Sequence, residues 1–559
     1  MRVVLVAINA KYIHSNLAVH SLRAYAQPYQ SEIEIAEYTI NQQVDEILQD
    51  IYKRQPELLC FSCYIWNLRY VETLVRELKK VLPRTQIWVG GPEVSYDAAE
   101  VLERLPELSG VMKGEGEATF LELLQYYHAE SEHTLAAIAG ISYRDCEENI
   151  CENTWREILD LSRLPFVYQN LAEFENKILY YESSRGCPFS CSYCLSSVDK
   201  CLRFRDLELV KKELQVFIDY RVPQVKFVDR TFNCHHKHAM EIWKYLLAHD
   251  EGVTNFHFEV AVDLLNEEEL QLIAQMRPGL IQLEIGVQST NVDTIREIRR
   301  TMEFSKVAEV VKRIQSAGNV HQHLDLIAGL PYEDLQSFQG SFDAVYELKP
   351  EQLQLGFLKV LKGSYMEEQK EAYALCYKSE APYEVLSTKW LSYADILVLK
   401  QVEEMVEVYY NSGQFHHTMR QLEQEFDSAF EMYQRLGAFY EANKLSMKSH
   451  TRVARYEILL AFIRSLPVKE EGLYAQLLTL DLYLRENVKT RPAFAGEYTV
   501  SKEEANVFRR LQKRTHLERF TYDVLGDGSK KELLLLFDYE NRNVLTQEAK
   551  LFPITTLQK

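Results

Sequence analysis

Two long stretches of the chain alternate short apolar runs with helical patterns, and this alternation restricts the fold more than any other feature. In the first stretch, the run Val3–Ile8 is apolar at every position, which is typical of a parallel strand buried on both faces. This rhythm predicts an α/β, Rossmann-like doubly wound domain over residues 1–130. Similar apolar runs recur near Ile35, Phe61, Val89 and Met112.

The second alternation begins at Leu179 and contains six further strand candidates. They read LYYESS, QVKFVD, FHFEVAVD, LIQLEIGV, HLDLIAGL and QLQLGFLKVL, and a helical stretch or a loop follows each one. Because a complete (βα) barrel has eight such units, six units predict a partial (βα)6 barrel over residues 176–375. In such barrels, functional groups lie at the C-terminal ends of the strands.

The remaining segments follow other patterns. Residues 131–175 are predicted to be a connector that includes one hairpin arm. From 376 to 559 glycine is rare and helix-forming residues dominate at helical spacing, which predicts a mainly α-helical domain. Two strand-like runs on either side of Gly526–Gly528 predict a hairpin near the end of this domain.

Length, charge and cysteine content narrow the class of protein. The 559 residues fit about three or four domains and carry a formal charge of −19. That charge makes nucleic acid an unlikely partner, because phosphate binding needs clustered Lys and Arg. No long uncharged apolar run predicts a membrane span, and the first residues lack a signal-peptide pattern. The scattered cysteines favour a reducing compartment over a disulfide scaffold, so a soluble cytoplasmic protein is expected.

One loop-like segment, Glu182–Ser197, contains three cysteines in the pattern C-x3-C-x2-C. These are Cys187, Cys191 and Cys194. Thiolates are soft ligands that suit iron–sulfur clusters. Three of them on one loop can hold three irons of a cubane, which leaves the fourth iron free to bind another molecule.

Two other interpretations of these cysteines stay open. Zinc also binds thiolates, and three histidines that could complete a zinc site lie further along the chain. Buried core cysteines are the other interpretation, which Gly186, Pro188 and the nearby serines disfavour because they indicate a loop. The three histidines are His235, His236 and His238.

The stretch from Cys187 to Cys194, CPFSCSYC, resembles the signature of the radical S-adenosylmethionine (SAM) superfamily, with Tyr193 in the usual aromatic position. The resemblance spans roughly Ile178 to Lys362. It implies a [4Fe–4S] cluster on the three cysteines, whose free iron binds the methionine end of SAM. It also implies reductive cleavage of SAM to a 5′-deoxyadenosyl radical, with electrons from a donor such as flavodoxin or ferredoxin.

Two strands of the predicted barrel resemble motifs that hold SAM in this superfamily. Phe227–Asn233 stands where the second strand helps to bind the methionine end, which implies this role for Asp229. Phe256–Asp263 resembles a strand that often ends in Arg-x-Asp, although Ala261 replaces the arginine. Glu259 alternates onto the same strand face and could substitute in the site, and a surface carboxylate is the alternative.

Two later segments resemble further strand-end motifs of the superfamily. Glu284–Ser289 matches the next motif, which implies that Gln288 contributes to cofactor binding. Leu326–Pro331 resembles the segment that packs near the adenine of SAM, which implies the same for Gly329.

Two glycine-containing loops follow late strands of the predicted N-terminal domain, where ligands of doubly wound sheets bind. A domain of this kind before a radical SAM barrel resembles the cobalamin-binding class of the superfamily. The absence of an Asp-x-His-x-x-Gly motif then implies a corrinoid without a protein histidine ligand. The alternative is a Rossmann-like domain that has lost its ligand and only docks onto the barrel. The implied cobalamin-binding residues are Gly90, Gly91, Gly114, Glu115 and Gly116.

Together these resemblances predict a cobalamin-dependent radical SAM methyltransferase that acts on an unactivated carbon and carries an uncharacterised C-terminal domain. No catalytic residue is assigned, and the substrate is not predicted. One alternative is a cyclase or rearrangement enzyme of the same class that transfers no methyl group. A second alternative is a non-catalytic sensor that binds the cluster and the corrinoid. A tRNA methylthiolase is disfavoured, because a second cysteine trio and a basic tail are absent.

Overall fold

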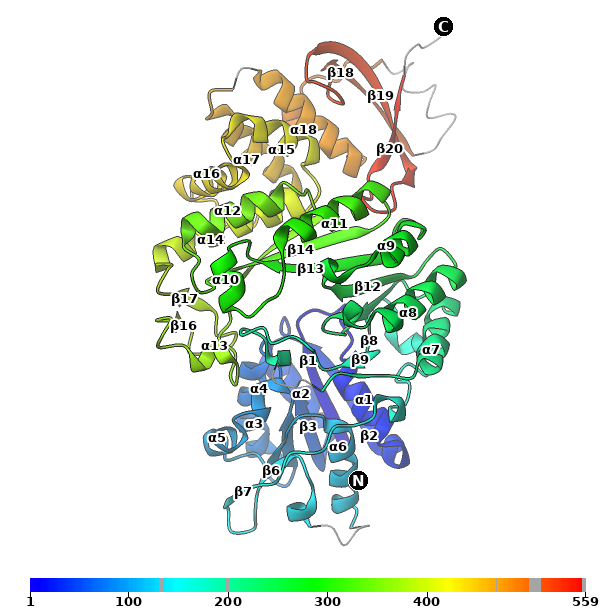
Figure 1. The fold of residues 1–559 in the computed structure, drawn as a ribbon, viewed down its shortest axis with the longest axis vertical. Coiled ribbons are helices and arrows are strands. Elements are labelled where there is room, and N and C mark those ends of the chain that lie inside the picture. The colour runs from blue at the N-terminus through cyan, green and yellow to red at the C-terminus, as the bar shows by residue number, and fades with distance from the viewer. Residues whose placement is uncertain (130–133, 198–200, 469, 502–513, 555–559) are drawn as a thin grey trace.

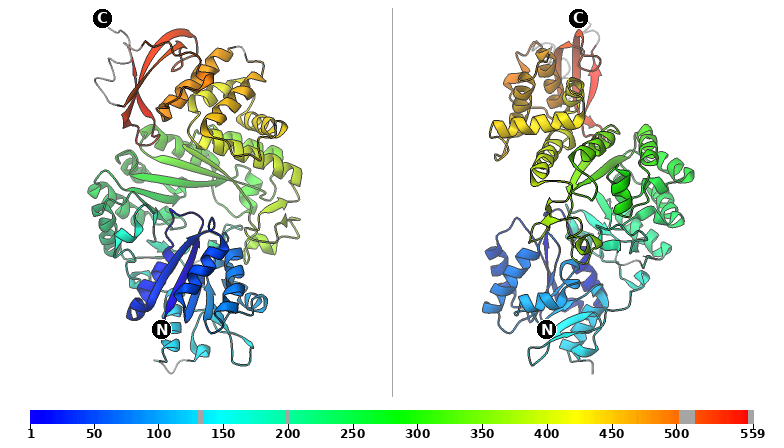
Figure 2. Two further views of the ribbon diagram at one scale, coloured as in Figure 1. Left: turned by 180° about the vertical axis from the view of Figure 1, so that it is seen from behind. Right: turned by 60° about the vertical axis from the view of Figure 1, so that its left-hand side comes forward.

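The computed structural model describes residues 1–129, 134–197, 201–468, 470–501 and 514–554. Along the long axis of Figure 1, an N-terminal α/β domain is followed by a central sheet with its helices and then by a helical C-terminal part. The two further views in Figure 2 keep this order, with the C-terminal hairpin in red at the far end. Within the described residues, no helix combines the length and apolar character that crossing a membrane requires.

The N-terminal domain is built on a seven-stranded sheet in the order β2-β1-β3-β4-β5-β6-β7. Alternate residues of β1 pack into two separate hydrophobic clusters, one on each face of the sheet. Helices cover both faces, which explains why β1 is apolar throughout and confirms the predicted doubly wound fold. The bounds are β1 Val3–Asn9, β2 Ile33–Thr39, β3 Leu58–Ser62, β4 Gln86–Gly90, β5 Gly110–Met112, α1 Leu17–Tyr25, α2 Val44–Arg54, α3 Leu68–Val81, α4 Pro92–Ser95, α5 Ala98–Arg104 and α6 Gly116–Tyr127.

The segment predicted to be a connector contributes two strands to this first sheet. β6 (Ile141–Arg144) pairs antiparallel with β5, and β7 (Ile150–Glu152) pairs antiparallel with β6. The hairpin covers the edge that β5 would otherwise leave unpaired. Only the rest of the segment, from 153 to 175, crosses to the central part of the molecule.

The central part is a six-stranded parallel sheet in the order β15-β14-β13-β12-β11-β8. Each strand follows its predecessor along the chain, as in a barrel, and this confirms the predicted partial (βα)6 barrel. The bounds are β8 Leu179–Tyr181, β11 Gln224–Phe227, β12 Asn255–Val260, β13 Ile281–Gln288, β14 His321–Ala328, β15 Gln352–Phe357, α7 Leu207–Asp219, α8 His236–His249, α9 Glu267–Ala274, α10 Val292–Glu297, α11 Phe304–Ala317 and α12 Leu335–Tyr346.

The C-terminal part is mainly helical and packs on the barrel, because one hydrophobic cluster contains residues of both. The two runs around Gly526–Gly528 form β18 and β19 of an antiparallel sheet, and a third strand, β20, pairs with β19. The bounds are α13 Tyr365–Glu368, β16 Cys376–Tyr377, β17 Val385–Ser387, α14 Tyr393–Val406, α15 His416–Leu422, α16 Ala429–Ala442, α17 Arg452–Arg464, α18 Glu471–Arg485, β18 Thr515–Tyr522, β19 Lys530–Arg542 and β20 Ala549–Pro553.

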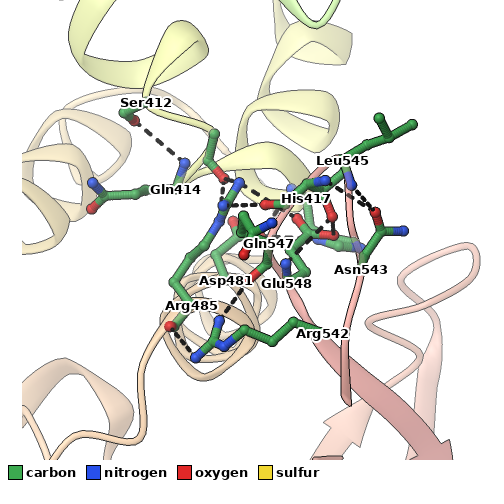
Figure 3. Close-up of polar contacts among 12 residues, drawn as sticks. Ser412, Gln414, His417, Asp481, Arg485, Arg542, Asn543, Leu545, Gln547 and Glu548 are labelled. Carbon is green, nitrogen blue, oxygen red and sulfur yellow. Dashed lines mark hydrogen bonds and ion pairs between the residues drawn. The ribbon is translucent and has the colours of Figure 1, made fainter. Parts of the chain in front are cut away.

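Polar contacts join these helices to the loop between β19 and β20 (Figure 3). The buried carboxylate of Asp481 accepts hydrogen bonds from the backbone N–H groups of His417 and Thr418 at 3.0 and 2.9 Å. It thereby pairs donors that the first turn of α15 leaves free. Arg485 donates to the carbonyl of Gly413, and Arg542 donates to the carbonyl of Arg485. The contacts of Asp481, Arg485 and Arg542 therefore hold the C-terminal part together.

Candidate active site

The three cysteines of the C-x3-C-x2-C pattern lie on one loop after β8. A short antiparallel pair, β9 (Ser184–Arg185) and β10 (Arg203–Phe204), joins the two ends of this loop. Gly186 has a φ of +91°, and a Cβ there would lie 2.6 Å from the carbonyl oxygen of Cys201, so only glycine fits. The cysteines all line one cavity of about 230 Å³ at the C-terminal ends of the barrel strands, and this cavity is called the smaller cavity below.

Arg300, which follows α10, contacts this loop with its guanidinium. Its Nη1 lies 2.9 Å from the hydroxyl of Tyr193 and 4.0 Å from Sγ of Cys191, and its Nη2 donates to the carbonyl of Gly286 at 2.6 Å. Burial raises the pKa of the Cys191 thiol, while the guanidinium of Arg300 favours the thiolate. Arg300 was missed by the sequence reasoning, since it comes from another part of the barrel and matches no motif used there.

The structure does not join the downstream histidines to the cysteines. His236 contacts Glu269 at 2.9 Å, His238 contacts the hydroxyl of Ser183 at 3.0 Å, and His235 caps α8. Thiolates that share one zinc lie about 3.8 Å apart, given Zn–S bonds of about 2.3 Å. The three sulfur atoms do not all lie within 4.8 Å of one another. This wider spacing fits a multi-iron cluster better than a mononuclear zinc site.

Three of the side chains predicted to bind cofactors line the smaller cavity together with the cysteines: Tyr193, Glu259 and Gln288. Gln288 follows a bulge in β13 at a φ of +71°, and its buried Oε1 has no hydrogen-bond partner. Nε of Arg300 is also buried without a partner. Because unpaired buried polar atoms are costly, the two atoms indicate a polar ligand in this cavity, and SAM has suitable donor and acceptor groups.

Glu259 projects from the C-terminal end of β12 and has no hydrogen bond among the described contacts. Burial and the neighbouring carboxylate of Glu284 raise its pKa to about 7. The two glutamates are register partners on adjacent strands, so their side chains lie on the same face. Glu259 is therefore a cavity residue, and the alternative of a surface carboxylate does not describe its position.

Two other predicted cofactor residues line neither cavity of the site. Asp229 is fully buried, and its carboxylate accepts hydrogen bonds from Ser183 N at 3.0 Å and from the hydroxyls of Ser183 and Ser184 at 2.6 Å. Gly329 packs against Val385, since a Cβ there would lie 2.8 Å from its Cγ1. Asp229 thus holds the start of the cysteine loop, and Gly329 allows a close approach of the C-terminal part.

A larger cavity of about 1050 Å³ lies between the N-terminal domain and the barrel. Its volume is at the upper end for enclosed small-molecule sites and suits a large cofactor. Gly91, with a φ of +114°, lies so close to the carbonyl of Cys63 that a Cβ would be 2.5 Å from the oxygen. The five residues predicted to bind cobalamin all line it: Gly90, Gly91, Gly114, Glu115 and Gly116.

Charged side chains connect the wall of the larger cavity to the cysteine loop. Arg185, two residues before Cys187, lies 3.4 Å from Glu115 and 3.0 Å from the buried Glu117. Arg203 also forms an ion pair with Glu115. Ser196, Arg230 and Glu259 line both cavities, so these two spaces adjoin at that point.

Three protein families match successive parts of this chain. The B12 binding domain matches residues 3–124, the radical SAM superfamily matches 181–345, and a protein family of unknown function, DUF4080, matches 371–541. The chain therefore carries a B12 binding domain followed by a radical SAM domain, which is the domain order predicted from the sequence. A radical SAM domain implies a [4Fe–4S] cluster, SAM and a reductant, and a B12 binding domain implies cobalamin.

Individual relatives of this radical SAM chain are distant in sequence. The cobalamin-dependent radical SAM methyltransferase TokK of Streptomyces tokunonensis is 26% identical over 314 residues, which are 52% of this chain and 45% of TokK. An anaerobic magnesium-protoporphyrin IX monomethyl ester cyclase of Cereibacter sphaeroides is 19% identical, over 57% of this chain and 53% of the cyclase. The chain therefore spans about half the length of these curated relatives.

A solved structure supports the overall fold of this radical SAM chain. The cobalamin-dependent SAM radical enzyme OxsB, with aqua-cobalamin bound, superposes with a TM-score of 0.61 at 14% identity. The match covers 91% of this chain and 83% of OxsB, so it includes the C-terminal part. At this identity the likeness concerns the fold alone.

Proposed function

We propose that this chain is a cobalamin-dependent radical SAM methyltransferase that acts on an unactivated carbon of a small molecule. The observation that carries the proposal is the junction of the two cavities at Ser196, Arg230 and Glu259. A substrate at this junction would be within reach of a ligand in either cavity. The name of TokK, a cobalamin-dependent radical SAM methyltransferase, supports the same reaction class.

The proposal gives distinct roles to the residues of the smaller cavity. Cys187, Cys191 and Cys194 would hold the cluster, and Arg300 would keep Tyr193 and the loop in place. Gln288 would accept a hydrogen bond from SAM through its unpaired Oε1. When bound, the cluster and SAM supply a carbon-centred radical and cobalamin supplies a methyl group. Flavodoxin or ferredoxin is the proposed electron donor.

A cyclase or rearrangement enzyme that transfers no methyl group is the second candidate. It is favoured by the relative named as an anaerobic magnesium-protoporphyrin IX monomethyl ester cyclase. The two candidates differ in the fate of the methyl group of SAM. A methyltransferase releases S-adenosylhomocysteine as well as 5′-deoxyadenosine, whereas the cyclase releases 5′-deoxyadenosine alone.

The decisive experiment uses full-length protein that is loaded anaerobically with iron, sulfide and cobalamin and then incubated with SAM and dithionite. We expect both nucleosides from the native protein and neither from the triple variant Cys187→Ala, Cys191→Ala, Cys194→Ala. The control Cys376→Ala removes an exposed cysteine outside the site and should leave both products unchanged. Zinc in place of the cluster would reject radical SAM chemistry, and no product from fully loaded protein would favour the non-catalytic sensor.

A further inference from the structure

A group of metal-binding side chains lies inside the barrel, on strands that carry none of the three cysteines. Glu284 of β13 and His323 of β14 are register partners, and Asp325 follows His323 by two residues on the same strand face. One ligand atom from each of the three lies within 4.8 Å of the others. Within the described residues, no other trio of His, Cys, Asp and Glu side chains meets this criterion.

One contact inside this trio is an ion pair that lacks the geometry of a hydrogen bond. Nε2 of His323 lies 2.9 Å from Oδ1 of Asp325, yet neither atom has a hydrogen-bond partner among the described residues. The side chain of His323 is only 8% exposed, so water does not easily replace the missing partner. Buried polar atoms without hydrogen bonds are costly, and both atoms of this ion pair are placed to bind a third atom.

The neighbouring strand repeats the same feature. Nε2 of His257, on β12, lies 3.0 Å from Oε2 of Glu284 and also lacks a hydrogen bond. His257 is 9% exposed at its side chain. Two buried imidazole nitrogens thus point toward the carboxylates of the trio from adjacent strands.

Several acidic side chains gather around the trio inside the barrel. Glu284, Asp325 and the nearby Glu259 bring three carboxyl groups, and the ammonium of Lys226 donates a hydrogen bond to Glu284 at 2.8 Å. Such a bond to a ligand carboxylate is typical of residues that orient metal ligands. A divalent cation would bind favourably to these carboxylates in this enclosed space.

We propose that Glu284, His323 and Asp325 bind a divalent first-row transition-metal ion that is separate from the cluster. One imidazole nitrogen and two carboxylate oxygens suit Mn²⁺, Fe²⁺ or Zn²⁺. Glu284 and Asp325 line the smaller cavity, so the ion has an open side toward that space. Three protein ligands with an open position are typical of metal ions that bind a substrate oxygen or nitrogen directly.

The test measures Mn²⁺ binding to full-length protein that carries the oxidised cluster and cobalamin(III), which are both silent in electron paramagnetic resonance. The signal of free Mn²⁺ then reports the bound fraction during a titration. We expect one ion per chain, and a loss of affinity of at least tenfold in His323→Asn and in Asp325→Asn. The matched control is His321→Asn, because His321 lies two residues before His323 on the same face of β14 and is not part of the trio.

The same samples are also tested for correct folding and for SAM binding, so that a loss of either is not mistaken for a loss of metal binding. Cluster absorbance and thermal unfolding show whether each variant is folded, and Asp325→Asn replaces His323→Asn as the test if the latter is not. Absence of a bound ion, or equal binding by the native protein and both variants, overturns the proposal. The proposal is also overturned if no ion binds and the variants lose affinity for SAM. In that case the side chains of the trio bind SAM and not a metal ion. None of these readouts depends on methyl transfer, so the proposed function fails or holds independently.

Discussion

Arg300 links the cysteine loop to β13 of the barrel. It contacts Tyr193, Gly286 and Cys191 at once, and lysine has no planar group that could make the same contacts. We expect Arg300→Lys to retain the cluster but to lower the rate of SAM cleavage about 10- to 100-fold, the equivalent of one lost charged hydrogen bond. Release of 5′-deoxyadenosine by anaerobic, cluster-loaded protein measures this rate.

The matched control for this substitution is Arg296→Lys. Arg296 lies four residues earlier, is exposed and pairs, among the residues that the structure describes, with Asp293 alone. It should cleave SAM at the native rate, since exposed ion pairs contribute little. Equal rates for Arg300→Lys and the native protein would show that the contacts to the loop do not matter for the reaction.

Glu333 is a fully buried carboxyl group outside both cavities, and it gives the protein a predictable pH response. Burial raises its pKa to about 7, although Ser289 and Ser341 donate hydrogen bonds to it. Between pH 4.5 and 7 the folded protein therefore holds a proton that the unfolded chain has released. Its contribution to the free energy of unfolding falls as the pH rises through this window, by roughly 1 to 3 kcal/mol.

Replacement by glutamine removes this titration, because the amide stays neutral at every pH. We expect Glu333→Gln to lose less stability than the native protein between pH 5 and pH 8, as measured by thermal unfolding at both values. The control Glu368→Gln, at an exposed position, should keep the native pH profile. Parallel profiles for the native protein and Glu333→Gln would contradict the assignment.

The residues that sequence reasoning placed in the site are those that share a short segment. Cys187 and Tyr193 lie on one loop, so their spacing alone predicts that they meet. Arg300 contacts the same loop from the segment after α10, and no local sequence pattern predicts that contact. The role predicted for Asp229 stays a prediction, because the sequence does not show that Ser183 and Ser184, which follow β8, donate hydrogen bonds to its oxygens.

At the scale of elements, sequence period predicted the parallel strands because both of their faces are buried. The antiparallel β6 and β7 were assigned to a connector, since their place in the first sheet depends on the free edge of β5 and not on their own composition. The short strands β9 and β10 are likewise not predicted by their own composition. Two residues per strand leave no period to detect, yet this pair fixes the base of the cysteine loop.

The turn between β4 and α4 offers a test at this scale. Gly91 has a φ of +114°, and a Cβ there would lie 2.5 Å from the carbonyl oxygen of Cys63. We expect Gly91→Ala to destabilise the N-terminal domain by about 2 to 4 kcal/mol and to lower cobalamin binding, because the turn borders the larger cavity. Thermal unfolding and the visible absorbance of bound cobalamin measure the two effects.

The control for the turn is Gly340→Ala within α12. A Cβ at that position meets no atom within 4 Å, and alanine is the better helix former. This variant should be as stable as the native protein or slightly more stable. An N-terminal domain that tolerates Gly91→Ala equally well would show that the turn can rearrange.

At the scale of the whole molecule, the two cofactor cavities depend on contacts between separate domains. The segment that contains α13 contacts both the cysteine loop and the N-terminal domain. Met366 N donates to the carbonyl of Ser192 in the loop, and Lys362 forms an ion pair with Asp97 of the N-terminal domain. Arg185 makes the more buried connection, from Glu182 of the barrel to Glu117 of the N-terminal domain. The relative position of the cavities therefore rests on a few buried ions as well as on packing.

Replacing Arg185 by methionine keeps most of its volume but leaves the carboxylate of Glu117, which is only 7% exposed, without its cation. An unpaired buried charge costs about 3 to 5 kcal/mol, and this cost falls on the interface because Glu117 belongs to the other domain. We expect Arg185→Met to split thermal unfolding into two transitions, with the N-terminal domain melting first. The control Arg104→Met breaks an ion pair with Glu72 that lies within one domain and is partly exposed, so it should shift the transition slightly without splitting it. A single, unshifted transition in Arg185→Met would mean that hydrophobic packing alone holds the two domains in place.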